Sequence, residues 1–456
     1  MARRLFGTDG VRGVAGEFLT AELTLALGRA ATTRASAVGS GSERPRVLVI
    51  RDTRASGEML EAAVAAGVAA AGGIALLGGV LPTPAAPLLI RRYGFDLGVV
   101  LSASHNPWRD NGVKFFGADG DKLSDAVEEE IEALLDEPVS GAGGGTVSAE
   151  PGGVTQLHGT LEDYLRELHT RFAELDLSGR RIVLDCANGA THRAAPEIFR
   201  RLGAHVDVIA DAPDGRNIND GCGSTHVEAL ADAVRRDGHD AGFAFDGDGD
   251  RVLAVDRNGT VVDGDELVAL AALHLRAQER LQGGGVAVTV MTNYGFHTAM
   301  ADAGVEVATT AVGDRYVLEA LRERGWTLGG EQSGHIIELG FAPSGDGIAS
   351  ALLTLEALNG GDLAERHAME KLPQTLVNVR LPDRAAVERA ASDEEMVAAV
   401  EQEQDALAGR GRVLVRASGT EPLLRVMVEA PSAEEAHAVC GRLVERAQAA
   451  AVEMAP

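Results

Sequence analysis

The chain has 456 residues, of which 45% are apolar and 24% are charged, so it can bury several cores and is expected to form about three or four domains. Its net charge of −26 and its 4% aromatic content argue against general binding to nucleic acids. A ligand that carries phosphate would therefore need a local cluster of basic residues. The three cysteines, Cys186, Cys222 and Cys440, form no Cys-x-x-Cys pair, which favours a reducing compartment over a disulfide framework or a thiolate zinc site.

The first block of the sequence alternates helical and strand-like segments. Such alternation predicts an α/β domain in which crossovers join parallel strands. A Gly-, Ser- and Ala-rich stretch, residues 140–153, follows and is interpreted as a linker or exposed loop. The predicted helices cover residues 21–37, 57–71 and 85–93, and the predicted strands cover residues 46–50, 74–77 and 97–101.

One stretch of this block, residues 62–81, is uncharged and long enough to cross a membrane. Gly72 and Gly73 interrupt it and three prolines follow, so a buried helix, a turn and a strand are favoured, with a membrane span as the alternative. The N-terminus lacks the apolar core of a signal peptide. We therefore expect a cytoplasmic protein.

The same alternation of helical and strand-like segments occurs in two further blocks, and the last block has a different pattern. We expect three similar α/β domains, over residues 1–153, 154–257 and 258–370, and a C-terminal α+β domain over residues 371–456. The second and third blocks show helices over 161–172, 265–282 and 296–303 and strands over 181–185, 205–209, 241–245, 286–291 and 305–309. The last block shows strands over 376–379, 413–416 and 424–429, a helix over 393–407 and a terminal helix from residue 433.

Three polar loops follow strand-like runs, where open α/β sheets place their ligands. The first, Ser102-Ala-Ser-His-Asn-Pro107, offers a hydroxyl at a tight turn that could act as a nucleophile, although the hexapeptide taken alone favours an ordinary turn. The second, Asp246-Gly-Asp-Gly-Asp-Arg251, can converge three carboxylates on one hard cation. It is not an EF-hand, because Arg251 and Arg257 stand where Gly and Glu are required, and Mg²⁺ completed by a phosphate oxygen is favoured over Ca²⁺.

The third loop, Arg416-Ala-Ser-Gly-Thr-Glu-Pro422, combines a guanidinium, two hydroxyls and a glycine turn, with Arg425 nearby. Such a loop fits one phosphate monoester, and its alternative is a helix cap or turn. The chain has no P-loop lysine motif, no His-Glu-x-x-His helix and no Gly-x-Gly-x-x-Gly turn. A hydroxyl, a Mg²⁺ loop and a phosphate cradle together indicate phosphoryl transfer.

These loops, together with Gly7-Thr-Asp-Gly-Val-Arg-Gly13 and Gly330-Glu-Gln-Ser-Gly-His335, occur in the order found in the α-D-phosphohexomutase family, and the chain resembles that family over nearly its whole length. The resemblance implies three similar α/β domains and a C-terminal α+β domain of the phosphatase-inhibitor-like type around a central cleft. Gln332 and the segment 111–116 are similar to those of members that act on glucosamine phosphates.

The resemblance also implies roles for individual residues. Ser104 matches the phosphoserine, and Asp246, Asp248 and Asp250 match the Mg²⁺ ligands, with a phosphate oxygen on Ser104 as a further ligand. The other matched residues are Arg12, His105, Lys114, Arg251 and His335 near the reacting centre, Glu331 and Ser333 at the sugar hydroxyls, Arg416, Ser418, Gly419, Thr420 and the nearby Arg425 at the phosphate, and Gly313-Asp-Arg315 as a positioning loop. Lys114 and His335 are both candidates for proton transfer, and the sequence does not choose between them.

The implied reaction converts glucosamine 6-phosphate into glucosamine 1-phosphate through phospho-Ser104 and a glucosamine 1,6-bisphosphate intermediate that turns end over end. The expected partners are the phosphorylated amino sugar and Mg²⁺, with no nucleic acid and no membrane, and the sequence leaves a homodimer open. The alternatives are specificity for glucose or mannose phosphates, a Mg²⁺-dependent sugar-phosphate phosphatase, and a sugar-phosphate sensor without activity.

Two further features are interpreted as structural. Arg51-Asp-Thr-Arg54 is expected to form a surface or interdomain ion pair of little energetic weight. Asn188-Gly189 and Asp220–Thr225 are expected to be turns that carry no chemistry.

Overall fold

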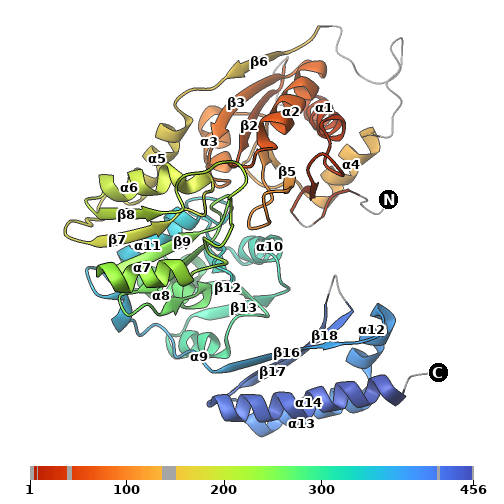
Figure 1. Ribbon diagram of the computed structural model, residues 1–456, viewed down its shortest axis with the longest axis vertical. Coiled ribbons are helices and arrows are strands. Elements are labelled where there is room, and N and C mark those ends of the chain that lie inside the picture. Colours follow the sequence, from red (N-terminus) through yellow and green to blue (C-terminus); the bar gives the residue numbers. More distant parts are fainter. Residues whose placement is uncertain (1–4, 8, 39–43, 136–149, 419–421, 454–456) are drawn as a thin grey trace. The chain divides into compact units, whose positions relative to one another are not determined.

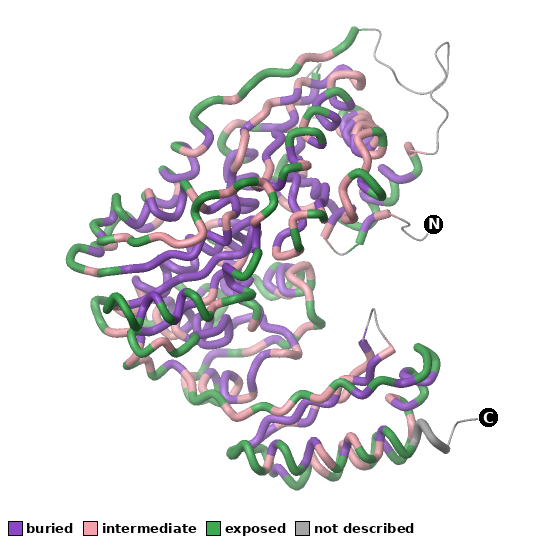
Figure 2. The backbone as a smooth tube through the Cα atoms, in the orientation of Figure 1, coloured by how far each residue is buried: buried purple, intermediate pink, exposed green. Residues whose placement is uncertain are grey.

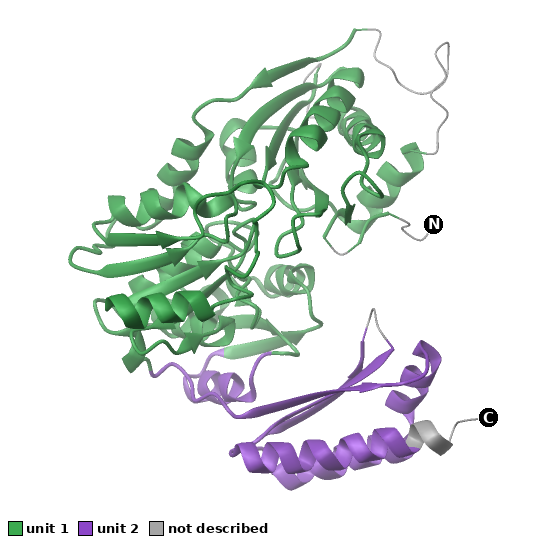
Figure 3. Cartoon of the chain, viewed as in Figure 1, with its two compact units in different colours: residues 1–291, 306–366 green, residues 292–305, 367–456 purple. Residues whose placement is uncertain are grey.

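The computed structural model describes residues 5–7, 9–38, 44–135, 150–418 and 422–453. Residues 450–453 are described by their backbone alone. The chain divides into two compact units (Figure 3). Unit 1 comprises residues 1–291 and 306–366, and unit 2 comprises residues 292–305 and 367–456. Among the described residues, three sheets lie in unit 1 and one lies in unit 2, each with its own helices (Figure 1).

The first sheet has the strand order β1-β5-β4-β2-β3-β6. Strands β2, β3, β4 and β6 are parallel, as the crossover pattern predicts, whereas β5 runs antiparallel to both β4 and β1. The strands are β1 Val11–Val14, β2 Arg46–Arg51, β3 Ile74–Val80, β4 Leu97–Leu101, β5 Asp110–Gly117 and β6 Gly153–Gln156, and the helices are α1 Ala21–Val38, α2 Gly57–Ala70, α3 Ala85–Tyr93 and α4 Asp125–Leu135.

The end of the predicted linker belongs to this sheet, which corrects the sequence interpretation at its last residues. Gly153 pairs with Ile74 as the first residue of β6. A Cβ atom on Gly152 would lie 1.7 Å from the carbonyl oxygen of Gly73, so this glycine permits a close approach of two backbones. Residues 136–149, the rest of the predicted linker, lie outside the described part of the chain.

The second sheet has the order β11-β10-β9-β7-β8, in which β7, β8 and β9 are parallel and β10 is antiparallel to its neighbours. Its strands are β7 Arg181–Asp185, β8 His205–Ile209, β9 Ala241–Phe245, β10 Val252–Asp256 and β11 Val261–Val262. The helical segments are α5 Thr160–Arg171, η1 Ala190–His192, α6 Ala194–Arg201 and α7 Glu228–Asp237.

The third sheet has the order β13-β12-β14-β15, with β14 and β15 joined as an antiparallel hairpin. Helix α8 ends at Ala277 rather than at the predicted residue 282, because the chain turns at Glu279, whose φ is 57°. The elements are α8 Gly264–Ala277, η2 Gln282–Gly284, β12 Gly285–Thr289, β13 Glu306–Thr310, α10 Asp314–Arg324, β14 Leu328–Gly330, β15 Ile336–Glu338, α11 Gly347–Leu358 and η3 Leu363–Glu365.

Unit 2 is built on the antiparallel sheet β16-β18-β17. It also takes in α9, a helix that the sequence places in the third block. The Asn293 side chain that caps α9 donates to the carbonyl of Leu372, and Glu429 of β18 accepts from the amide of Tyr294 at 2.8 Å. The elements are α9 Tyr294–Asp302, β16 Gln374–Arg380, α12 Arg384–Ser392, α13 Glu394–Leu407, β17 Arg412–Ala417, β18 Leu423–Glu429 and α14 Ala433–Glu453.

Two fully buried strands lead into the loops that carry the predicted site residues. Every residue of β4 and of β9 is buried (Figure 2), which explains their uninterrupted apolar runs in the sequence. The Ser104 loop and the Asp246–Asp250 turn begin directly after these two strands. Among the described residues, no helix is long and apolar enough to cross a membrane, and residues 62–81 form the end of α2, a turn and β3.

An ion-pair cluster ties α5 to the third sheet and its helix α11. Arg171 contacts Glu338 at 2.8 Å and Glu356 at 3.1 Å. Burial raises the pKa of Glu356, but the His274 ring at 3.6 Å, hydrogen bonds from Arg171 and the charges of Arg171 and Arg280 lower it to about 2. Ionised Glu356 therefore stabilises the fold above its unfolded-state pKa, and this contribution is lost as the pH falls from about 4.5 towards 2.

We expect Glu356→Gln to lower the free energy of unfolding near neutral pH and to matter less in acid. The difference from wild type should narrow by roughly 1 kcal/mol between pH 6 and pH 4, as measured by urea unfolding. Glu162→Gln removes an exposed carboxylate that pairs with Arg201 and is the matched control, for which a smaller pH-dependent difference is expected because solvent screens the pair. A difference for Glu356→Gln that is constant with pH would contradict the assignment.

Candidate active site

Ser104 stands on a loop whose backbone is fixed from several sides. Its φ is 52°, a left-handed conformation that a serine keeps only where its surroundings impose it. The Ser104 amide donates to Ser102 Oγ at 2.9 Å. The Ser104 carbonyl accepts from Arg54 Nη2 at 2.8 Å and from Asn219 Nδ2 at 2.9 Å. The loop is therefore held by its main chain, and the Ser104 hydroxyl donates to Asp246 Oδ2 at 2.5 Å.

The expectation of a weak surface pair at Arg51-Asp-Thr-Arg54 is wrong for its last residue. The side chains of Asp52 and Arg54 are fully buried and form an ion pair of 2.8 Å. Arg54 also donates to the carbonyls of Asn106, Pro107 and Asp110. This guanidinium is the clamp of the serine loop, and it lies inside because the loop carbonyls that follow β4 have no strand neighbour to satisfy them.

The three aspartates of the second loop converge as their spacing predicts. Asp246, Asp248 and Asp250 are buried, and each offers a carboxylate oxygen within 4.8 Å of the others. Gly249 adopts φ 73°, and a Cβ atom on Gly247 would lie 2.7 Å from the carbonyl oxygen of Ser104, so both glycines are needed for the tight turn.

This group fits a divalent cation. Asp248 Oδ1 and Asp250 Oδ1 are buried and have no hydrogen-bond partner among the described residues. Burial and the neighbouring charges of Asp250 and Asp248 raise the pKa of Asp246 well above its usual value. A hard cation would satisfy the free oxygens and offset this crowding of negative charge.

Lys114 lies beside the aspartate turn. Its ammonium contacts Asp248 Oδ2 at 2.8 Å and Asp9 Oδ2 at 3.0 Å. Burial alone lowers the pKa of Lys114, but Asp248, Asp9 and Asp250 outweigh it and raise the pKa. Asp9 also pairs with Arg12 and with Lys122, and these cations hold its own pKa well below the usual range against the effect of burial.

His105 lies beside Ser104, and Arg251 lies beside the aspartate turn. His105 Nδ1 lies 3.3 Å from Ser104 Oγ, and burial together with the charges of Arg251 and Arg12 lowers the pKa of His105. The Arg251 amide donates to Asp246 Oδ1 at 3.1 Å, and its guanidinium lies 3.8 Å from Asp250. His105 is therefore next to the Ser104 hydroxyl, and Arg251 is next to two of the three aspartates.

The β14–β15 hairpin carries the third group of predicted residues. His335 Nδ1 lies 3.8 Å from Asp250 Oδ2, and its Nε2 accepts from the amide of Gly345 at 3.0 Å, which places the ring proton on Nδ1. Glu331 is buried and accepts from the amide of Gly313 at 3.1 Å, whereas Ser333 is exposed at the tip of the hairpin turn. The Gly313-Asp-Arg315 segment thus abuts Glu331.

The predicted phosphate loop belongs to unit 2. Arg416 on β17 stands directly opposite Arg425 on β18, and neither side chain makes an ion pair with the described residues. Burial and the charge of Arg425 lower the pKa of Arg416. Two like charges opposite each other destabilise a sheet, and a bound anion would offset this repulsion. Ser418 follows β17, and Gly419 and Thr420 lie outside the described residues.

Unit 1 brings together most of the predicted site residues: Ser104, the three aspartates, Arg12, His105, Lys114, Arg251 and His335 are linked through the contacts above. Sequence analysis did not predict the roles of six further residues at this site. They are Arg54, Asn219, Thr83 and the charged group of Asp9, Lys122 and Asp314. Thr83 donates to Asp248 Oδ2 at 2.6 Å. Of these residues, Asp9, Arg54 and Asp314 lay inside quoted motifs. The loop with Asn188-Gly189 packs its backbone against Gly247, since a Cβ atom on Gly189 would meet the carbonyl oxygen of Gly247 at 2.3 Å.

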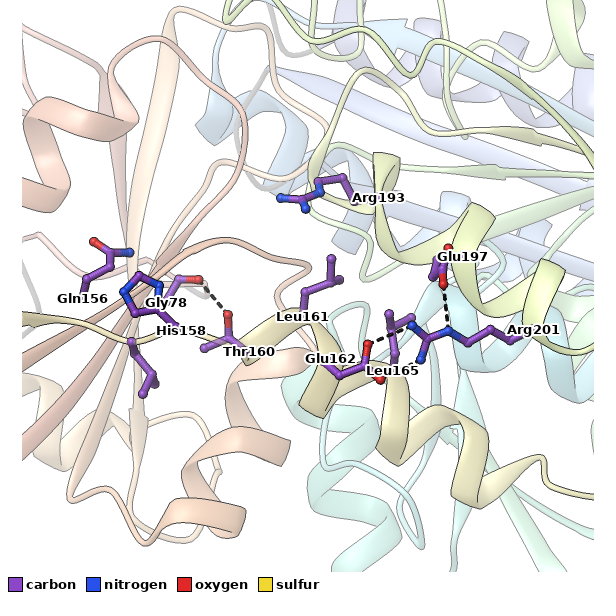
Figure 4. A pocket seen from close by; sticks show the side chains of 12 residues that line it. Gly78, Gln156, His158, Thr160, Leu161, Glu162, Leu165, Arg193, Glu197 and Arg201 are labelled. Carbon is purple, nitrogen blue, oxygen red and sulfur yellow. Dashed lines mark hydrogen bonds and ion pairs between the residues drawn. The ribbon is translucent and has the colours of Figure 1, made fainter.

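A separate cavity of about 590 Å³ lies beside the N-terminus of α5 (Figure 4). His158, Thr160, Arg193 and Arg201 are among its lining residues. Arg201 pairs there with Glu162 and Glu197, each at 2.8 Å. None of the predicted site residues lines this cavity.

Family models match the chain in four consecutive segments. The phosphoglucomutase/phosphomannomutase alpha/beta/alpha domains I, II and III match residues 3–140, 162–259 and 263–376, and the C-terminal domain of the same family matches residues 376–446.

Relatives and solved structures agree with these matches. The chain is 51% identical to the phosphoglucosamine mutase of Moorella thermoacetica, over 95% of this chain and 96% of that protein, and 51% identical to that of Thermobifida fusca, over 97% of each. Its fold is similar to that of a phosphoglucomutase/phosphomannomutase family protein from Burkholderia thailandensis, with a TM-score of 0.83 at 23% identity over 99% of this chain and 98% of that one. It is also similar to the Aspergillus fumigatus N-acetylphosphoglucosamine mutase in complex with GlcNAc-6P and magnesium, with a TM-score of 0.71 at 19% identity over 98% and 96% of the two chains.

Proposed function

The chain belongs to the phosphoglucomutase/phosphomannomutase family and, within it, to the phosphoglucosamine mutases, and from this premise we propose how its residues interconvert glucosamine 6-phosphate and glucosamine 1-phosphate. Ser104 carries the phosphoryl group. The bond between Ser104 Oγ and phosphorus breaks as a bond from the sugar O1 to phosphorus forms, and the O1 proton leaves to a base. The proton taken from O1 ends on Ser104 Oγ. The resulting 1,6-bisphosphate then reorients end over end, the bond between O6 and phosphorus breaks as the bond from Ser104 Oγ to phosphorus forms, and the Ser104 proton passes to O6.

The observation that carries this proposal is the contact of Ser104 Oγ with Asp246, beside buried carboxylate oxygens of Asp248 and Asp250 that have no hydrogen-bond partner among the described residues. Asp246, Asp248, Asp250 and a phosphate oxygen on Ser104 would hold Mg²⁺, which when bound neutralises charge on the transferring phosphoryl group. Lys114, Arg12 and Arg251 lie close enough to these aspartates to add further positive charge.

Proton transfer is assigned to His335 rather than to Lys114. Asp248 and Asp9 hold Lys114 as an ammonium, and that form stabilises charge but cannot accept a proton. His335 is oriented by the Gly345 amide, and its Nδ1 faces the aspartate turn. Glu331 and Ser333 are proposed to contact sugar hydroxyl groups.

Arg416, Arg425, Ser418, Gly419 and Thr420 are proposed to bind the phosphate that is not being transferred. Because the bisphosphate presents its two ends in turn, one cradle must accept either phosphate. We also propose four domains with the bounds expected from the sequence, while a cytoplasmic location and a homodimer stay predictions from the sequence.

We expect Arg425→Gln to have opposite effects on binding and on stability. Removing one of two facing guanidinium groups should weaken phosphate binding by roughly 10- to 100-fold, because hydrogen bonds to charged groups contribute about 1.5–3 kcal/mol each. The unliganded protein should be slightly more stable, because the repulsion between Arg416 and Arg425 is gone. Calorimetric titration with inorganic phosphate and thermal unfolding measure the two effects.

The matched control is Arg380→Gln, which removes an exposed arginine from β16 of the same sheet. It should leave the affinity for phosphate unchanged. An unchanged affinity in Arg425→Gln, or an equal loss in both variants, would contradict the cradle.

The proposed substrate is tested by phosphorus NMR of the Mg²⁺-loaded protein with equal glucosamine 6-phosphate and glucose 6-phosphate and a trace of both bisphosphates. Faster growth of glucosamine 1-phosphate with little inorganic phosphate is the expected result. Faster growth of glucose 1-phosphate would contradict the specificity, and accumulation of inorganic phosphate would favour the phosphatase alternative.

A further inference from the structure

A row of ion pairs joins helix α10 to the segment that follows β5. Lys122 contacts Asp314 at 2.5 Å, Arg315 pairs with Asp125, and Arg322 pairs with Asp121. Residues 121–125 come from the first block of unit 1, and residues 314–322 come from its third block. We call this row, residues 121–125 against 314–322, the α10 seam.

Lys122 differs from the other cations of the seam because it also faces the site. Its side chain is 17% exposed, close to the 18% of Arg315 and below the 44% of Arg322, so its contacts rather than its burial set it apart. Besides Asp314, its ammonium contacts Asp9 Oδ1 at 2.5 Å, and the other oxygen of Asp9 contacts Lys114 at 3.0 Å. One carboxylate therefore joins the seam to the lysine that touches Asp248.

The other end of the row also reaches the site. Asp314 Oδ2 lies 3.8 Å from His335 Nε2, and His335 Nδ1 lies 3.8 Å from Asp250 Oδ2. Asp248 and Asp250 belong to one turn, so these contacts form a closed ring of side chains. In order around the ring, its members are Asp248, Lys114, Asp9, Lys122, Asp314, His335 and Asp250. Lys122 is the member of this ring that bridges the first block to the third.

The local fold is built to present Lys122 at this place. The chain turns back after β5 with a hydrogen bond of 2.8 Å from the Gly117 amide to the Asp121 carbonyl, and Lys122 then pairs with Phe116. Gly120 adopts φ 82°, and a Cβ atom there would lie 3.0 Å from the Pro87 carbonyl oxygen. The tight turn fixes the backbone of Lys122, so its side chain is held at both ends.

Lys122 and its carboxylate partners Asp9 and Asp314 are in their charged forms. Burial lowers the pKa of Lys122, but Asp314 and Asp9 outweigh burial and raise it. Burial raises the pKa of Asp314, but the charge of Lys122 and its hydrogen bond outweigh burial and lower it. Lys122, Asp314 and Asp9 are therefore ionised near neutral pH.

We propose that Lys122 is a positioning residue for phosphoryl transfer, which fixes Asp9 and hence Lys114 against the aspartate turn, and fixes the start of α10 against His335. This inference rests on the proposed function in that the transfer takes place at Ser104. Lys122 acts through its two carboxylate partners and not by contact with the sugar.

Loss of Lys122 should slow the transfer more than it weakens binding. Asp9 keeps Lys114 and Arg12 as partners, so the first block keeps its fold, but Asp314 loses its partner in the first block. A displacement of about 1 Å at reacting groups costs on the order of 10²-fold in rate. We therefore expect Lys122→Met to lower kcat by about 10²-fold with KM changed by less than about threefold.

The experiment compares three variants of the full chain. Lys122→Arg keeps the charge and can fork to both carboxylates, so it should recover to within about tenfold of wild-type kcat. Arg322→Gln removes an exposed pair of the same seam and should keep wild-type kcat. Equal losses in Lys122→Met and Arg322→Gln would overturn the proposal, as would a KM effect without a kcat effect.

Hydrogen exchange by mass spectrometry gives a readout that does not need activity. Exchange in residues 313–317 and 331–335 should rise in Lys122→Met and stay as in wild type in Arg322→Gln, with the rest of unit 1 unchanged. Unchanged exchange in both segments would overturn the bridge. If the wild-type chain makes no glucosamine 1-phosphate, the proposed function fails, and the exchange data still decide whether Lys122 couples the two blocks.

Discussion

Ser104→Ala should lower mutase turnover by at least about 10⁴-fold while the affinity for glucosamine 6-phosphate stays within a few-fold of wild type. The alanine leaves no oxygen to carry the phosphoryl group between the two ends of the sugar. The loop should keep its shape, because Arg54, Asn219 and Ser102 hold it through main-chain atoms of residue 104. Turnover measured with bisphosphate present, and calorimetric titration with substrate, separate the two effects.

A matched control is Ser350→Ala, which removes another buried hydroxyl of unit 1. Ser350 Oγ donates to the carbonyl of Asp346 inside helix α11, at 2.7 Å. This variant should keep wild-type turnover. Full turnover in Ser104→Ala would mean that another group carries the phosphoryl group, whatever the geometry at Asp246.

Arg54→Met should be the most destabilising single change near the site, lowering the free energy of unfolding by about 3–5 kcal/mol. It leaves the buried carboxylate of Asp52 without its ion-pair partner and removes hydrogen bonds to the carbonyls of the serine loop. Because that loop sets the position of Ser104, kcat should also fall, by about 10²-fold. Urea unfolding and steady-state kinetics measure the two losses.

Arg51→Met, three residues earlier in the same tetrapeptide, is the control. Arg51 pairs with Glu58, whose side chain is 82% exposed, and at 3.5 Å with Glu61, whose side chain is 15% exposed, so the loss should be well below that in Arg54→Met. The double variant Asp52→Asn with Arg54→Met should regain part of the stability, because the unpaired buried charge is gone. Equal losses in Arg51→Met and Arg54→Met would contradict the clamp.

The sequence predicted those parts of the fold in which local pattern and tertiary environment agree. Strands β4 and β9 are buried on both faces and appear as unbroken apolar runs, and helix α3 begins and ends where predicted. Strand β5 was missed because Asp110, Asn111 and Lys114 interrupt its apolar pattern, and those polar residues are tolerated there by partners distant in the sequence. A short window of sequence does not contain such partners.

The same reasoning separates the site residues that were predicted from those that were missed. The three aspartates and Ser104 lie in dense motifs whose spacing already indicates their chemistry. Arg54 and Lys122 act by what they contact 50 and 192 residues further along the chain, and neither has a neighbouring sequence signal for it. The pairing of Arg416 with Arg425 became visible only with the register of β17 and β18.

The central claim is that the phosphoryl group passes between Ser104 and the sugar. The most direct measurement is a single-turnover chase, in which Mg²⁺-loaded protein is labelled with radioactive phosphate from glucosamine 1,6-bisphosphate, the label is located by mass spectrometry, and unlabelled glucosamine 6-phosphate is added. We predict that the label sits on Ser104 and moves to the sugar at the rate of turnover. Label on another residue, or label released as inorganic phosphate at that rate, would contradict the account.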